Sequence, residues 1–205
     1  MENIKSSGIC RREDISNKMK QVKLSTRRLV LRMPETRDIE SLIANINNIN
    51  VARYLSKVPH PYTKKDARWF ISNCAKKARK KPRTDYNFGI ELKQEGRVIG
   101  GIGIHDINTE NGSCEIGYWL GEKYWRQGIT YEAAQRVIGF AFRDLKMRRV
   151  EVKAFVENDA SNGLIKKLGF SYEGTQRKAV KAKSTGKFHD VNIYAMLRED
   201  WMRRK

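Results

Sequence analysis

The chain has 205 residues, with Lys+Arg 42 against Asp+Glu 23, a formal net charge of +19 and 40% hydrophobic residues. This length suits one domain with a sizeable core, and no apolar run approaches the roughly 18–20 residues needed to cross a bilayer. Three unpatterned cysteines and three widely spaced histidines argue against a disulfide scaffold and a metal site. The first twenty residues lack the apolar core of a secretory signal, so we expect a cytoplasmic protein without a bound metal.

The N-terminal half is predicted to begin with a flexible extension over residues 1–23, which are polar and lack sustained periodicity. One domain is expected over residues 24–205. A short strand at 29–31 precedes a helix over about 36–46, where apolar residues recur at helical spacing. The pair Thr63 and Asp66 resembles the capping box that opens a second helix.

The central and C-terminal parts alternate strands and helices. Turn residues such as Gly96 separate three successive strand patterns, which predicts antiparallel pairing. The later pattern then predicts a helix, a strand, a shorter helix that ends near Gly169, and a closing hairpin. The fold class is therefore α+β, one domain with a mixed, mostly antiparallel central sheet flanked by helices. The predicted elements are strands at 86–92, 97–105 and 114–120, a helix at 128–145, a strand at 150–156, a short helix, and strands at 172–182 and 188–197.

Residues 115–133, EIGYWLGEKYWRQGITYEA, read as a strand, a tight loop and the start of a helix. Backbone N–H groups at a helix N-terminus have no internal partner and carry partial positive charge, and Gly128 lets the loop approach a ligand closely. This arrangement predicts a pyrophosphate cradle. Its spacing fits neither the Walker A loop nor the GxGxxG fingerprint.

Three segments in order resemble the GNAT acetyltransferase superfamily: residues 115–133, residues 158–170 (NDASNGLIKKLGF) and residues 190–201 (DVNIYAMLREDW). The resemblance covers about residues 24–202 and is greatest to the branch of ribosomal-protein alanine and serine N-acetyltransferases. It implies the GNAT fold, acetyl-CoA as cosubstrate and direct transfer of an acetyl group to an amine. Many GNAT enzymes reprotonate the coenzyme thiolate with a tyrosine at the position that is Ile165 here, and this chain has Ser161 and Asn162 instead.

The resemblance also implies site residues. Glu115 is the candidate general base, acting directly or through a water, although an outward-facing strand glutamate is the alternative reading. Ser161 is the candidate acid for the leaving thiolate, or a plain first-turn helix serine. Cys114 is read as a core residue and not a nucleophile. The expected cofactor-binding residues are Tyr118, Trp119, Leu120, Arg126, Gln127, Gly128, Ile129, Thr130, Asn158, Ser161 and Asn162.

Two residues depart from the family loop. Arg126 replaces a common glycine and Thr130 replaces a glycine or alanine. Arg126 keeps its N–H in place only if its backbone angles suit a side chain, and Thr130 brings a branched side chain close to the phosphates. His105 and Asp106, at a predicted strand end, have two alternative readings, a place at the border of the substrate site or a structural role. A lone histidine is more often structural, so His105 is left out of the catalytic set.

The acceptor is left open by the sequence, because acceptor specificity lies in loops without a readable motif. The N-terminus of a ribosomal or another protein is the first hypothesis. The alternatives are a small amine (a polyamine, an amino acid or an aminoglycoside) and a basic RNA-associated protein that keeps the fold without turnover. The positive charge is compatible with RNA contact and equally with solvated faces. The chain is expected to be a monomer or a homodimer without membrane contact.

Overall fold

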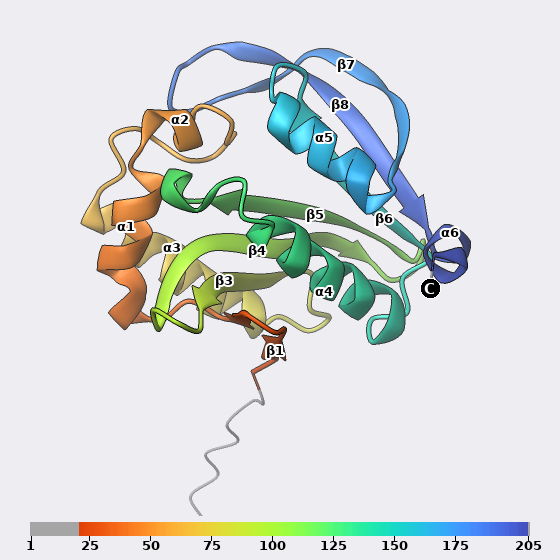
Figure 1. The fold of residues 1–205 in the computed structure, drawn as a ribbon, viewed down its shortest axis with the longest axis horizontal. Helices are drawn as coiled ribbons and strands as arrows, with labels where there is room; N and C mark the ends of the chain where they lie inside the picture. The colour runs from red at the N-terminus through yellow and green to blue at the C-terminus, as the bar shows by residue number, and fades with distance from the viewer. Residues whose placement is uncertain (1–20, 205) are drawn as a thin grey trace, which may run out of the picture.

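The computed structural model describes residues 21–204, and Figure 1 shows their arrangement. Within these residues one eight-stranded sheet has the order β1-β2-β3-β4-β5-β6-β8-β7. Neighbouring strands are antiparallel except for β5 and β6, which run parallel. The strands are β1 (Leu24–Ser25), β2 (Leu29–Arg32), β3 (Tyr86–Leu92), β4 (Arg97–Asn108), β5 (Ser113–Leu120), β6 (Arg149–Phe155), β7 (Ser171–Lys181) and β8 (Phe188–Leu197).

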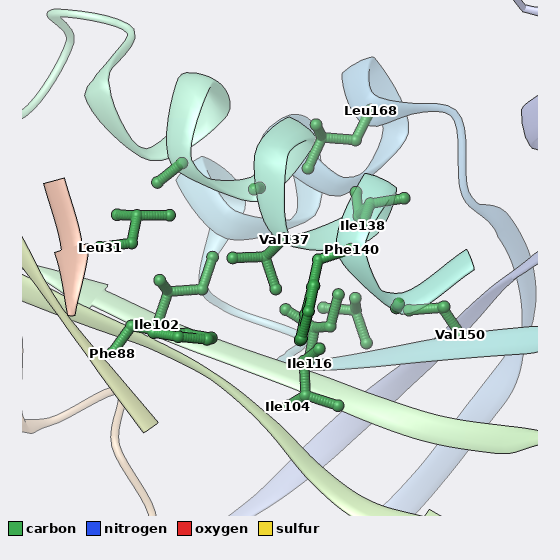
Figure 2. Close-up of a cluster of buried hydrophobic side chains, with 14 of the residues drawn as sticks. Leu31, Phe88, Ile102, Ile104, Ile116, Val137, Ile138, Phe140, Val150 and Leu168 are labelled. Carbon is green, nitrogen blue, oxygen red and sulfur yellow. The ribbon is translucent and has the colours of Figure 1, made fainter. Parts of the chain in front are cut away.

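Helices cover both faces of the sheet. Successive strand residues point to opposite faces, so Ile104 and Ile116 pack under Val137 and Phe140 of α4 (Ile129–Arg143), as Figure 2 shows. A second apolar cluster joins α1 (Ile39–Ile46) and α3 (Lys64–Ala78) to the opposite face, where Trp119 packs against it. The helices are α1 (Ile39–Ile46), α2 (Ile49–Ala52), α3 (Lys64–Ala78), α4 (Ile129–Arg143), α5 (Asp159–Leu168) and α6 (Arg198–Arg203), with single 3-10 turns at Thr36–Asp38 and Glu122–Tyr124.

The parallel pair β5 and β6 separates along its length. Pairing runs from Ser113 with Arg149 to Ile116 with Val152 and then stops. Residues 117–120 of β5 continue to pair with β4, while the rest of β6 pairs only with β8. The β5 edge that faces β6 therefore has no strand partner from residue 117 onward, and the sheet opens there.

The β7–β8 hairpin bends away from the sheet and arches over toward α2 (Figure 1). Its tip is docked by two hydrogen bonds: the Lys183 N–H donates to Ser56 O at 3.1 Å, and Ser184 Oγ donates to Ala52 O at 3.0 Å. The hairpin tip and α2, which are far apart in sequence, thus lie side by side above the gap between β5 and β6.

The predicted α+β class and the mostly antiparallel sheet are confirmed. The capping box is present, since Thr63 Oγ1 accepts from the Asp66 N–H and the Asp66 carboxylate accepts from the Thr63 N–H. Gly96 adopts the left-handed backbone expected in the turn between β3 and β4. The helix predicted to end at about residue 145 ends at Arg143, and the short elements β1, α2 and α6 were not predicted.

Two further expectations concern the ends and surroundings of the chain. The predicted extension over residues 1–23 falls almost wholly on residues 1–20, which lie outside the described residues. Within residues 21–204, no helix is both long and apolar enough to cross a membrane.

Candidate active site

A cavity of about 1040 Å³ occupies the opening between β5 and β6 and extends under α2 and α5. It reaches both faces of the sheet, because Glu115 and Gly117 point to one face and Tyr118 to the other. Of the predicted site residues, the cavity brings ten together: Glu115, Tyr118, Trp119, Leu120, Arg126, Gly128, Ile129, Thr130, Asn158 and Ser161. Gln127 and Asn162 do not line it.

The loop before α4 has the geometry of an anion cradle. Gly128 is the N-cap of α4 with φ 72°, and Arg126 has φ 61°. Arg126 stands where the family loop commonly has glycine, and it adopts the left-handed backbone that glycine favours. For a residue with a side chain this conformation costs about 1–2 kcal/mol. The free N–H groups of the first turn of α4, which begins at Ile129, lie beside Thr130 in the cavity. The side chain of Gln127 instead donates to Lys123 O at 3.0 Å, which braces the loop.

Arg28, which was not predicted from the sequence as a site residue, stabilises this loop by two contacts. Its Nη1 donates to Gln127 O at 3.0 Å, and its Nε pairs with Glu132 in the first turn of α4 at 2.6 Å. Thr26 Oγ1 donates to the same carboxylate. Burial raises the pKa of the Glu132 carboxyl, but the hydrogen bonds from Thr26 and Arg28 outweigh it and hold the pKa below its usual value. No local sequence signal links residues a hundred positions apart.

On the α5 side of the opening, the Tyr118 hydroxyl lies 2.9 Å from Ser161 Oγ. Asn158 is the N-cap of α5, and its side-chain oxygen accepts from the Ser161 N–H at 3.2 Å. Burial raises the pKa of Tyr118 to about 12, so the phenol keeps its proton at neutral pH. Ile165, one helical turn after Ser161, is fully buried in the core.

Asn162 is used for structure. Its amide nitrogen donates to the carbonyls of Phe155, Val156 and Asn158, and its oxygen accepts from Asn192 and Tyr194. The residue is 8% exposed. Because its hydrogen-bonding capacity is spent on tying α5 to β6 and β8, the contacts give Asn162 a supporting role and leave no side-chain group for a ligand.

On the opposite side of the opening, Glu115 lines the cavity and is partly exposed to solvent. Its carboxylate pairs with Lys153 Nζ at 2.7 Å, with the two side chains 28% and 38% exposed. The hydrogen bond to Glu115 raises the pKa of Lys153. Glu115 is the cross-strand partner of His105 on β4 and of Glu151 on β6. The cavity thus has a carboxylate on one face and a Tyr118–Ser161 pair on the other.

The aromatic residues around the opening have packing contacts. The Trp119 ring lies against Gly101 and joins the α1–α3 cluster. Trp125 Nε1 donates to Leu120 O at 2.8 Å, which closes the end of β5. Cys114 is buried in the core, where burial raises the pKa of its thiol to about 12 and leaves it a poor nucleophile. Among residues 21–204, no group of three or more His, Cys, Asp or Glu residues is placed to hold a metal ion.

Comparisons with known proteins agree with this geometry. Residues 28–171 match the model of the acetyltransferase (GNAT) domain. The chain is 32% identical over 180 residues to the uncharacterized N-acetyltransferase p20 of Bacillus licheniformis, and the match covers 87% of this chain and 97% of that protein. It is 35% identical over 104 residues to the ribosomal-protein-serine acetyltransferase of Escherichia coli, 51% of this chain and 57% of that one.

A solved structure of the microcin self-immunity acetyltransferase MccE in complex with acetyl-CoA and AMP superposes with a TM-score of 0.72 at 25% identity, covering 84% of this chain and 93% of the other. The chain therefore belongs to the GNAT acetyltransferase family and is an acetyl-CoA-dependent N-acetyltransferase. The residues present fit the cosubstrate: an unpaired strand edge suits the amides of the pantetheine arm, and the start of α4 suits a pyrophosphate.

Proposed function

We propose that the protein transfers an acetyl group from acetyl-CoA to the α-amino group of a protein N-terminus. The observation that supports this most is the placement of Glu115 and of the Tyr118–Ser161 pair on opposite sides of one continuous cavity. A base and an acid separated in this way can serve the incoming amine and the leaving thiol of one reaction without neutralising each other.

Each residue has a role in this scheme. Acetyl-CoA supplies the activated thioester. Glu115 accepts a proton from the amine, directly or through a water, as the nitrogen attacks the acetyl carbon. The backbone N–H groups of Tyr118 and Leu120, which face away from β4 toward the open edge of β5, polarise the carbonyl oxygen. As the carbon–sulfur bond breaks, Ser161 gives a proton to the thiolate and is resupplied through Tyr118, and the products are an amide and free coenzyme A.

The choice of a protein N-terminus is supported by the charges around the cavity. Its lining includes the acids Glu115, Glu157 and Asp159, but also four cations, Arg53, Arg126, Lys153 and Lys167. A polycation such as a polyamine favours a predominantly acidic pocket, which this is not. The relative from Escherichia coli is named for ribosomal-protein serine acetylation, and that class of acceptor is our proposal for this chain.

The test is free-thiol release from acetyl-CoA with peptides that begin with Ala, Ser, Thr or Met, beside spermidine and free lysine. Turnover with one peptide class is expected, and Glu115→Gln should lower kcat about a hundredfold or more. Lys153→Met is the matched control for loss of the ion pair without loss of the carboxylate, and it should retain most activity. Turnover with spermidine or lysine alone would overturn the N-terminal acceptor, and RNA binding without any acetyl transfer would overturn the enzymatic role.

A further inference from the structure

The face of the sheet that holds Glu115 also holds a histidine. His105 and Glu115 are directly paired across β4 and β5, so both side chains leave the same face. The His105 ring lies over two glycines. A methyl group at Gly103 would lie 2.6 Å from His105 Nε2, so only glycine leaves room for the ring there. A methyl group at Gly117, which lines the cavity, would lie 3.7 Å from Cδ2 and 3.9 Å from Nε2.

The other ring nitrogen of His105 is held by a buried carboxylate. His105 Nδ1 lies 3.2 Å from Asp85 Oδ1, and the Asp85 side chain is 6% exposed against 32% for His105. Asp85 also accepts from Lys77 Nζ at 2.6 Å and Thr84 Oγ1 at 2.7 Å. Burial raises the pKa of Asp85, but the hydrogen bonds from Lys77, Thr84 and His105 outweigh it and hold the pKa below its usual value.

An ionised Asp85 accepts hydrogen bonds and donates none, so Nδ1 of a neutral His105 carries the proton. The lone pair is then on Nε2, the nitrogen that lies over Gly103 and 3.9 Å from the methyl position of the neighbouring Gly117. Within residues 21–204 no protein group hydrogen-bonds this Nε2. His105 itself does not line the cavity, but its ring neighbours Gly117, which does. The geometry therefore presents an unpaired ring nitrogen beside a cavity-lining glycine, on the same face as Glu115 and with the other ring nitrogen held by a carboxylate.

We propose that His105, oriented by Asp85, is a second proton acceptor for the amine that attacks acetyl-CoA, and that it shares this task with Glu115. This inference rests on the proposed function. At neutral pH the acceptor amine is mostly protonated to the ammonium form, since its pKa is about 8. It loses one proton before attack and a second as the new C–N bond forms, so two bases at the same face serve the two losses. The carboxylate of Glu115 is moreover already engaged by Lys153.

The first experiment needs no acceptor. Two-bond ¹H–¹⁵N NMR correlation of the histidine rings in the full-length protein reads the tautomer of neutral His105. The expected form carries its proton on Nδ1 and has a free Nε2, and Asp85→Asn should weaken this preference. A ring protonated on Nε2 alone in the wild-type protein would overturn the proposal.

The second experiment uses the peptide class that gives turnover, with acetyl-CoA. His105→Asn keeps a side-chain N–H for Asp85 but removes the base, and its kcat should fall about tenfold to a hundredfold with an unchanged KM for acetyl-CoA. His105→Ala should fall similarly and regain activity with added imidazole, which a purely structural histidine would not allow. His60→Ala, at an exposed histidine, is the matched control and should behave as wild type.

The outcomes separate the two proposals. Wild-type rates in His105→Asn, together with turnover by the unmodified protein, would overturn the role of His105 and leave the proposed function standing. A loss in His105→Ala that imidazole does not relieve, with Asn fully active, would assign His105 to packing alone. Absence of turnover by the wild-type protein with every peptide counts against the proposed acceptor, and the tautomer measurement still decides the state of His105.

Discussion

The Tyr118 hydroxyl and Ser161 Oγ lie 2.9 Å apart and join the open edge of β5 to the first turn of α5. This contact spans 43 residues of sequence. Many GNAT enzymes have a tyrosine at the position that is Ile165 in this chain. Here the hydroxyl groups at the cavity come instead from Tyr118 and Ser161. A phenol from the neighbouring strand thus lies beside the serine, and a proton can pass between the two.

Replacing Tyr118 with phenylalanine should lower kcat about tenfold while the KM for acetyl-CoA changes little. The loss of one hydrogen bond to Ser161 corresponds to about 1.4 kcal/mol, and the ring itself continues to fill its place. Steady-state thiol release measures both constants. Tyr172→Phe is the control, because that exposed hydroxyl bonds only Thr175 at 2.8 Å. A Tyr118→Phe enzyme with wild-type kcat would remove Tyr118 from the reaction.

Substitution by alanine should have different effects on stability at two glycines that lie on the same face of the sheet. At Gly117 a methyl group would meet only His105, at 3.7–3.9 Å, so the fold should tolerate it within about 0.5 kcal/mol. At Gly101 the methyl would lie 2.5 Å from Trp119 Nε1 and push the indole off the sheet, at about 1–3 kcal/mol. Urea denaturation measures the difference.

The Gly117→Ala variant should also change function. Gly117→Ala narrows the acceptor side of the cavity, so it should raise the KM for the peptide while coenzyme A binding measured by calorimetry stays unchanged. Equal effects of Gly117→Ala on peptide and coenzyme would show that the space over Gly117 does not belong to the acceptor.

The pairing of Glu132 with Arg28 should make stability depend on acid pH. The pKa of Glu132 is lower in the folded protein than in the unfolded chain, so its contribution is complete above the unfolded value, near 4.5, and is lost as pH falls through the folded value. Glu132→Gln should therefore cost about 1.5 kcal/mol at pH 7 and less at pH 3. Denaturant midpoints at both pH values test this, and an equal cost at both would contradict it.

A buried ion network near α1 should be essential for stability. Arg32 pairs with Asp38 at 2.7 Å and Glu91 at 2.6 Å, with side chains 9%, 5% and 18% exposed. Arg32→Met leaves two carboxylates without a cation and should cost about 3–5 kcal/mol. Asp38→Asn should cost less, because Arg32 keeps Glu91. Urea denaturation ranks the variants, and the reverse order would contradict this account.

The sequence predicted most of the fold because its signals are local. Apolar periodicity identified the long helices, and the Thr63–Asp66 pair specified a capping box that the structure contains. The loop around Gly128 was identified from a glycine before a helix start together with the resemblance of residues 115–133 to the GNAT family, and the structure gives Gly128 the left-handed backbone of the N-cap. Short elements such as α2, with four residues, leave no periodic pattern and were missed.

The sequence by itself determined the family, the order of the long elements and the positions of Glu115, Gly128 and Ser161 in their motifs, since these depend on residues close together in the chain. Only the tertiary structure decided which side chains meet. Strand alternation and register place Glu115 on one face and Tyr118 on the other, and long-range packing brings Tyr118 to Ser161, Arg28 to Glu132 and Asp85 to His105. Such contacts arise from chain closure over tens of residues, which no local pattern encodes.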